Sequence, residues 1–393
     1  MNKLYNTYEE ISNNMYSYFS KFTLSKTFLN FFPQLLISII KAESSTFSKI
    51  ALAASKIFPS ILLDSITKRI HRFFNNSNYN LKNLYSNVIY DVLSRLTLSH
   101  GGTDNLHVSF DHTYIKDKYT ILMFTLRIGK QGIPLYFEIF PGKDDEKHGD
   151  AFKTKTIKDG ITFCHNLLSE FFPNAKIIFL ADRWFGNLFP LMNYINELGD
   201  IYVFRLKENC KVFFYDKNEG HKIWVSLNDI PHYVHKSNII ENLEFTKKKY
   251  VANLVFCKSK GHKEPWKLIT NGNPKQAKAF YGYRFGSIES VFKLTKTNGF
   301  YIEETGIKNF HAMKNFYSTI CITHLYLTCL GSDISKNSNC YKNIGFRITR
   351  KNTKTNNIIR VVSRVRAGII LFKLAINSKI YYRLPCTFTL YDT

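Results

Sequence analysis

Apolar residues recur every three or four positions through most of the first hundred residues. The spacing is clearest in residues 28–42 (FLNFFPQLLISIIKA), 45–58 (STFSKIALAASKIF) and 84–98 (LYSNVIYDVLSRLTL), and it predicts amphipathic helices. The pattern ends at HGGTDN, residues 100–105, a sequence rich in turn-forming residues. We therefore expect a helical N-terminal domain over residues 1–104.

From residue 105 the pattern changes to alternating polar and apolar positions. Residues 105–115, 119–129 and 133–142 are three such segments with short turns between them, and they predict an antiparallel meander. A helix beginning near Asp150, a short apolar strand ending at Asp182, a second helix and a further strand follow. This order of elements is typical of a ribonuclease-H-like core, and we expect residues 105–210 to form its first part.

Short strands with polar turns occupy the next part of the chain, residues 211–272, and they predict a β-rich insertion. One long helix, from about Pro274 through Lys296, is expected to close it. The fold class predicted is therefore α/β, with a mixed sheet and flanking helices. Residues 273–335 would complete the core.

A further helix is predicted over residues 311–330, ending at Gly331, before a basic C-terminal region, residues 336–393. Asp392 is the only acid in that region, against many lysines and arginines. Such a segment forms either a phosphate-contacting surface or a solvated face. Because it also contains apolar runs, we expect it to be folded and to face DNA.

The whole chain of 393 residues has a formal net charge of +24 and a pI near 9.6. A positive field of this size favours polyanionic partners, first nucleic acid and second an anionic membrane. Two functions are therefore open for the small, basic helical N-terminal domain. It either binds DNA or only packs on the domain that follows it.

The cysteines and the N-terminal apolar run bear on the compartment. The seven cysteines include no CxxC pair, which argues against a structural zinc site and against a disulfide framework. The run FLNFFPQLLISII is broken by a proline and is too short to cross a membrane, and nothing before it resembles a signal peptide. We expect a cytoplasmic protein that does not bind membranes.

Three acids occupy positions suited to a common site. Asp111 lies in the first predicted strand, Asp182 ends the short apolar strand, and Glu289 lies on the long helix after the insertion. Ligands of an open α/β sheet gather at the carboxyl ends of its strands, and the first and fourth strands of this fold are neighbours. Three converging carboxylates would hold Mg²⁺ or Mn²⁺, and two such ions catalyse phosphodiester chemistry.

Each acid also has an ordinary structural explanation. Asp111 could be a hydrogen-bonded residue near a turn, and Asp182 could cap a loop. Glu289 precedes Lys293 by four positions, a spacing typical of a surface ion pair worth a few tenths of a kcal/mol. The three positions together, in a basic chain, favour the metal site.

The segments around these acids resemble the motifs of insertion-sequence DDE transposases. The similar segments are FDHTYI (110–115), FLADRWFGN (179–187), YVFRLKEN (202–209) and YGYRFGSIESVFKLTK (281–296). The subgroup is the one whose third motif reads Y-x2-R-x3-E-x6-K. The resemblance runs from about residue 105 to at least residue 305, and it implies a ribonuclease-H-like catalytic domain with a β-strand insertion before the final glutamate.

The resemblance assigns roles to individual residues. Asp111, Asp182 and Glu289 would be the catalytic, metal-binding triad, with Mg²⁺ or Mn²⁺ as the cofactor and two ions expected. The resemblance assigns DNA contacts to Tyr281, Arg284, Lys296, Arg205 and Lys207. On physical grounds we also expect DNA contact at Lys293, from the helix face, and at the aromatic ring of Trp184. For Trp184, stacking on an unpaired base and simple packing of its loop remain open.

One departure from the motif concerns its spacing. Four residues separate Arg284 from Glu289, where the motif has three. We expect a π-bulge at Gly286 to absorb the additional residue. A regular α-helix from residue 284 to residue 289 would exclude this explanation.

The function predicted is that of a DNA transposase. It would cut at the ends of its mobile element and join the freed 3′ ends to target DNA. Double-stranded DNA, as terminal inverted repeats and as target, would be its partner. The resemblance implies a bacterial, nucleoid-associated protein that acts as a homodimer in the active complex, with a hairpin intermediate on the element ends. The alternatives are another ribonuclease-H-like nuclease or a transposase-derived DNA-binding protein that does not cleave.

Overall fold

The computed structural model describes residues 3–96, 105–142, 150–216, 220–230, 238–257, 264–336, 349–351, 358–360, 362–376 and 388. The chain forms two compact units, and its two ends belong to the same one. The helical unit comprises Met1–Gly101 with Val291–Thr393, and the sheet unit comprises Gly102–Ser290. The segment 273–335, which we expected to complete one core, is therefore divided between the two units.

The sheet unit confirms the α/β class, because its strands form one mixed ten-stranded sheet. The strand order is β3-β2-β1-β4-β5-β10-β9-β8-β6-β7. The strands are β1 (Leu106–Ile115), β2 (Tyr119–Ile128), β3 (Gln131–Pro141), β4 (Ile177–Ala181), β5 (Ile201–Arg205), β6 (Lys211–Asp216), β7 (His221–Ser226), β8 (Asn238–Phe245), β9 (Tyr250–Cys257) and β10 (Trp266–Thr270).

The first three strands form the expected antiparallel meander. Strand β4 pairs in parallel with β1 and with β5, as a crossover through a helix requires. Strand β10 then pairs antiparallel with β5, so strands β6 to β10 extend the same sheet. The predicted β-rich segment is thus continuous with the sheet.

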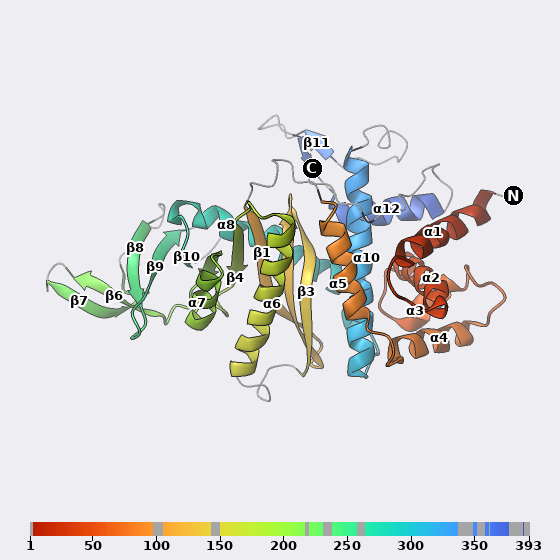
Figure 1. The fold of residues 1–393 in the computed structure, drawn as a ribbon, viewed down its shortest axis with the longest axis horizontal. Helices are drawn as coiled ribbons and strands as arrows, with labels where there is room; N and C mark the ends of the chain where they lie inside the picture. Colours follow the sequence, from red (N-terminus) through yellow and green to blue (C-terminus); the bar gives the residue numbers. More distant parts are fainter. Residues whose placement is uncertain are drawn as a thin grey trace. The chain divides into compact units, whose positions relative to one another are not determined.

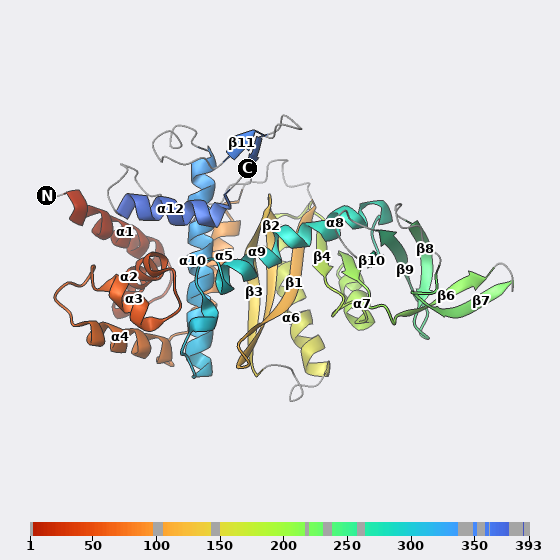
Figure 2. The same cartoon turned by 180° about the vertical axis from the view of Figure 1, so that it is seen from behind.

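Helices cover both faces of this sheet. Figures 1 and 2 view it from opposite sides, with α6 (Asp150–Phe171) and α7 (Phe189–Glu197) over one face. Helix α8 (Pro274–Gly286) lies over the other face and contacts β1, β4, β5 and β10. Strands β1 and β4 are enclosed in this way, which explains the continuous apolar sequence of β4.

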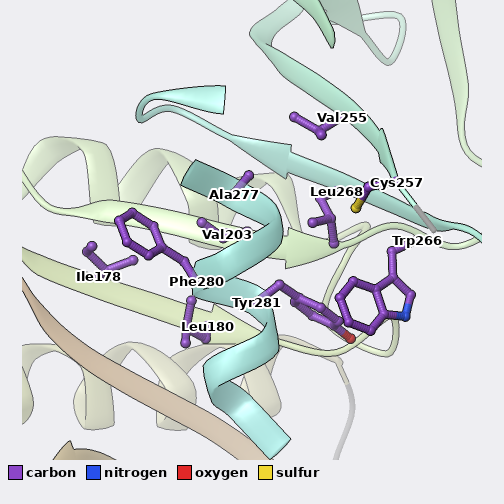
Figure 3. Packing of buried hydrophobic residues seen from close by; sticks show 10 residues of the cluster. All are labelled: Ile178, Leu180, Val203, Val255, Cys257, Trp266, Leu268, Ala277, Phe280 and Tyr281. Atoms are coloured by element: carbon purple, nitrogen blue, oxygen red, sulfur yellow. The ribbon is translucent and has the colours of Figure 1, made fainter. Parts of the chain in front are cut away.

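An apolar cluster holds α8 against the sheet (Figure 3). Ala277, Phe280 and Tyr281 of the helix pack on side chains of β4, β5, β9 and β10: Ile178, Leu180, Val203, Val255, Cys257, Trp266 and Leu268. Burying one large apolar side chain contributes about 1.5–3 kcal/mol, so this cluster fixes the position of the helix.

The prediction of one continuous helix from Pro274 through Lys296 is wrong, because two helices occupy this segment. Helix α8 ends at Gly286, and α9 (Ile288–Lys296) begins after a single non-helical residue, Ser287, with φ −95° and ψ −92°. The expected π-bulge is therefore replaced by a break. The buried Ser287 hydroxyl lies 2.8 Å from the Thr125 hydroxyl, which anchors the break to β2.

Gly132 allows the backbone of β3 to approach the helix break at Ser287 closely. A Cβ there would collide with the backbone carbonyl of Ser287. Strand β3 and the helix break are thus in direct backbone contact, which only glycine at that position permits.

The helical unit confirms that the N-terminal region is helical. Its elements are α1 (Lys3–Phe19), α2 (Lys26–Ala42), α3 (Phe47–Ala54), α4 (Leu63–Asn75), α5 (Leu81–Leu93), the 3₁₀ turn η1 (Ile302–Glu304), α10 (Phe310–Lys336), β11 (Thr349–Lys351), β12 (Ile358–Arg360) and α12 (Arg364–Ile376). Helix α10 packs against α12 and α5. Of the basic region 336–393, only part lies within the described residues.

Gly331 does not end α10, contrary to our prediction. The helix continues through it to Lys336. A Cβ at Gly331 would collide with the carbonyl oxygen of Arg364, and one at Gly368 would collide with that of Leu327. Both glycines therefore allow α10 and α12 to approach closely. Within the described part of the chain, no helix is long and apolar enough to cross a membrane.

Candidate active site

Sheet register brings the first two acids together. Parallel pairing of β1 with β4 matches Phe110 with Ala181, so Asp111 and Asp182 follow on adjacent strands. Asp182 comes directly after the last residue of β4, where the backbone leaves the sheet. The side chain of Asp111 is 19% exposed and that of Asp182 is 33% exposed. Both are thus largely withdrawn from water but not sealed from it.

Glu289 reaches the same place from the other side of the helix break. It lies in the first turn of α9, two residues after Ser287. Its side chain is 48% exposed, the most open of the three acids. The non-helical residue Ser287 lies between Arg284 and Glu289, and the side chains of these two residues are in contact.

Arg284 lies at the centre of the three acids. Its Nη2 forms an ion pair with the Asp111 carboxylate and lies 3.9 Å from Oδ2 of Asp182. Its Nη1 lies 3.3 Å from Oε1 of Glu289. The residue is only 3% exposed. One buried guanidinium therefore neutralises part of the charge of three carboxylates from three separate segments of the chain.

The acids respond differently to burial and to this cation. Burial is the largest influence on Asp111 and raises its pKa, and the charge of Arg284 offsets only part of that effect. Burial also acts to raise the pKa of Asp182, but Arg284, the Arg183 backbone amide and Tyr281 together outweigh it, so the pKa is lowered. Asp182 is thus the more firmly ionised of the two aspartates.

Hydrogen bonds fix the orientation of both aspartates. The Tyr281 hydroxyl donates to Oδ1 of Asp182 at 3.1 Å, and the Arg183 backbone amide donates to the same oxygen at 2.6 Å. The backbone amide of His112 donates to Oδ1 of Asp111 at 2.9 Å. The Oδ2 atoms of both aspartates consequently face Arg284.

Tyr281 and Arg284 have different surroundings from those we expected. Both were predicted to contact DNA phosphates, yet both are buried and both use their polar ends on the acids. Burial, followed by the charge of Asp182, raises the pKa of Tyr281, so its hydroxyl remains a donor. In this arrangement their role is to hold the acids, and DNA contact by Arg284 would require its side chain to move.

The remaining predicted DNA-contacting residues lie around the site or in the other unit. Trp184 is 36% exposed and its ring packs edge-on against His112 at 4.7 Å. Arg205 pairs with Glu264 at 3.2 Å. Lys207 is exposed near the start of the loop that follows β5.

Lys293 and Lys296 belong to the helical unit. Lys293 is exposed, and Lys296 pairs with Glu303 at 3.0 Å. The structure therefore brings together five of the predicted residues in the sheet unit: Asp111, Asp182, Glu289, Tyr281 and Arg284.

The donor chemistry of the three acids suits a hard cation such as Mg²⁺ or Mn²⁺, but their present spacing does not. Among the residues that the structure describes, no three acidic, histidine or cysteine side chains are close enough to hold a metal ion. In this arrangement the guanidinium of Arg284 lies between the acids and supplies positive charge there. An ion could be held by Asp111, Asp182 and Glu289 once that side chain withdrew.

Several contributors to the site were not found from the sequence. Ser287, Thr125 and Gly132 create the helix break, and Glu264 engages Arg205. The only signal for the break was Gly286 within the stretched motif. The partners of Ser287 come from β2 and β3, more than a hundred residues earlier, and no local pattern identifies them.

Known proteins add no further assignment. No protein-family model matches this chain, and no characterised protein matches its sequence. The case for any family therefore rests on the motifs and on the geometry of the acids.

Proposed function

We propose that the protein is a metal-dependent DNA strand-cleaving and strand-transferring enzyme of the DDE transposase type. Asp111, Asp182 and Glu289 are its catalytic acids. The observation that carries this proposal is their convergence. They come from segments separated by 71 and 107 residues of sequence, and all three contact one buried arginine.

The topology supports a ribonuclease-H-like core. The order β3-β2-β1-β4-β5, with β4 and β5 parallel to β1, agrees with the element order that the sequence predicted. Strands β6 to β10 lie in the chain between this core and the helix pair that carries Arg284 and Glu289. This is where the resemblance places a β-strand insertion.

The acids supply what phosphodiester chemistry requires. When bound, divalent ions would activate a water or a 3′-hydroxyl and stabilise the leaving oxygen. The Tyr281 hydroxyl and the Arg183 amide hold Oδ1 of Asp182, which leaves Oδ2 to face the centre. Half-exposed Glu289 leaves one side of the site open to a substrate. The formal charge of +24 favours a polyanionic substrate such as DNA.

Cleavage of DNA by the purified full-length chain tests the proposal. Duplexes carrying the DNA that flanks the gene on each side, incubated with Mg²⁺ or Mn²⁺, should be nicked at the element ends. Asp182→Asn and Glu289→Gln should each lower the rate by about a thousandfold or more, because each removes a charge from the same centre. Asp229→Asn, an exposed acid outside the site, should leave the rate unchanged.

Equal activity of the wild type and Asp182→Asn would refute the proposal. DNA binding without cleavage, by the wild type and by all variants, would favour the alternative of a DNA-binding protein derived from a transposase. The inverted repeats, the homodimer and the strand-transfer step belong to the same proposal. They predict terminal repeats beside the gene and a two-protein, two-end complex in mass photometry.

A further inference from the structure

The position of Arg284 among the three acids suggests a role for this residue beyond that of the proposed catalytic acids. Three carboxylates and one guanidinium leave a formal charge of −2 at the centre. The guanidinium of an arginine is cationic under all ordinary conditions. Any divalent ion that enters must therefore compete with a cation already present.

The contacts of Arg284 are extensive but incomplete. Its Nε lies buried with no hydrogen-bond partner. One of its three acidic contacts, to Asp182, is 3.9 Å long and so is an electrostatic contact longer than a hydrogen bond. A buried donor left without a hydrogen-bond partner is unfavourable. The guanidinium is thus held by charge more than by a full set of hydrogen bonds.

The backbone around Arg284 is fixed independently of its guanidinium. One turn before Arg284, Phe280 and Tyr281 pack in the apolar cluster. Three residues after Arg284, the hydroxyl of Ser287 is hydrogen-bonded to the hydroxyl of Thr125. The side chain could therefore leave the acids by rotation about its own bonds, without displacing α8 or α9. Long arginine side chains have the torsional freedom for such a change.

We propose that Arg284 is an exchangeable counter-ion, which occupies the acidic centre until a divalent cation replaces it. Asp111, Asp182 and Glu289 can then close around the ion. Arg284 in turn becomes free to pair with an external phosphate, for which its planar fork is suited. This inference rests on the proposed function, because it takes the three acids to be the ion's ligands.

Binding of Mn²⁺ alone to the full-length chain, measured by electron paramagnetic resonance of the free ion, tests the exchange. Arg284→Gln should bind Mn²⁺ about tenfold more tightly than the wild type, because the competitor is removed. Arg284→Lys keeps the charge and should fall between the two. Arg127→Gln is the matched control and should bind as the wild type does. This substitution also removes one cation from the sheet unit. The Arg127 side chain lies over the ring of Tyr283 and donates a hydrogen bond to the backbone carbonyl of Gly129.

The outcomes separate this inference from the proposed function. If Arg284→Gln and Arg284→Lys bind Mn²⁺ no more tightly than the wild type, Arg284 is a support for the acids and the counter-ion role is refuted. Adding Asp182→Asn to Arg284→Gln should abolish the gained affinity. If the double variant binds as tightly as Arg284→Gln, the ion is not bound at these acids, and the proposed metal-dependent function fails as well.

Discussion

Helix α8 contributes to two buried regions of the sheet unit that are held together in different ways. On one side lies the apolar cluster around Phe280, Leu268 and Trp266, where complementary shape decides the structure (Figure 3). On the other lies the centre formed by Arg284 and three acids, where the balance of charge decides it. Tyr281 belongs to both, with its ring in the cluster and its hydroxyl on Asp182.

The difference between the two regions bears on the exchange proposed for Arg284. Apolar packing has no low-energy substitute, since a lost side chain leaves a cavity. A buried group of carboxylates instead needs a counter-charge, because removal of one partner leaves an uncompensated buried charge. In the exchange proposed for Arg284, the cluster positions the helix while the acidic centre changes its occupant.

Truncation of Phe280 should have the largest effect on folding. Phe280→Ala leaves a cavity between α8 and β4, and we expect the free energy of unfolding to fall by about 3 kcal/mol. Phe285→Ala on the same helix is the matched control, because Phe285 is 36% exposed, and it should lower stability by less than about 1 kcal/mol. Chemical denaturation would measure both. Similar losses for the two would show that the cluster does not fix the helix.

Some features of these two regions could be predicted from sequence. Alternating and continuous apolar patterns identified β1 and β4, and the order of elements was enough to place Asp111 beside Asp182. Both inferences depend on local periodicity and on general rules of connection, which survive without knowledge of distant contacts.

Other features depended on contacts that no local pattern encodes. The break at Ser287 requires Thr125 and Gly132 from distant strands, so the sequence predicted a continuous helix. The sequence predicts a helix end at Gly331, whereas this glycine lies within α10 and allows α12 to approach it closely. The place of Arg284 among the acids follows from the break and could not be derived without it.

A second prediction concerns His107, which lies on β1 beside α8, between the rings of Phe280 and Tyr283. Burial, and then the charge of Arg127, lower the pKa of His107 to about 4. The unfolded chain protonates this residue near pH 6.5, so between these values it binds more protons than the folded chain. Stability should therefore fall as the pH falls from about 6.5 to about 4.

Replacement of His107 isolates this contribution. His107→Phe keeps a ring between Phe280 and Tyr283 and cannot be protonated. Between about pH 7 and about pH 5, the wild type should lose about 2 kcal/mol more stability than the variant. Equal pH dependence would mean that the pKa of His107 is the same in the folded and unfolded chains. Burial of His107 between Phe280 and Tyr283 would then not disfavour its charged form, and the contact of α8 with β1 would not be an apolar one.

The smallest expected effect comes from Tyr281, where the two regions meet. Tyr281→Phe keeps the ring in the apolar cluster and removes the hydroxyl from Asp182, so it should lower the free energy of unfolding by about 1 kcal/mol. Tyr283→Phe, on the same helix, should change it by only a few tenths of a kcal/mol. Because the Tyr281 hydrogen bond lowers the pKa of Asp182, the same variant should raise that pKa. A loss as large as that of Phe280→Ala would contradict the separation of the two regions, since removing one hydroxyl would then disturb the packing that the ring maintains.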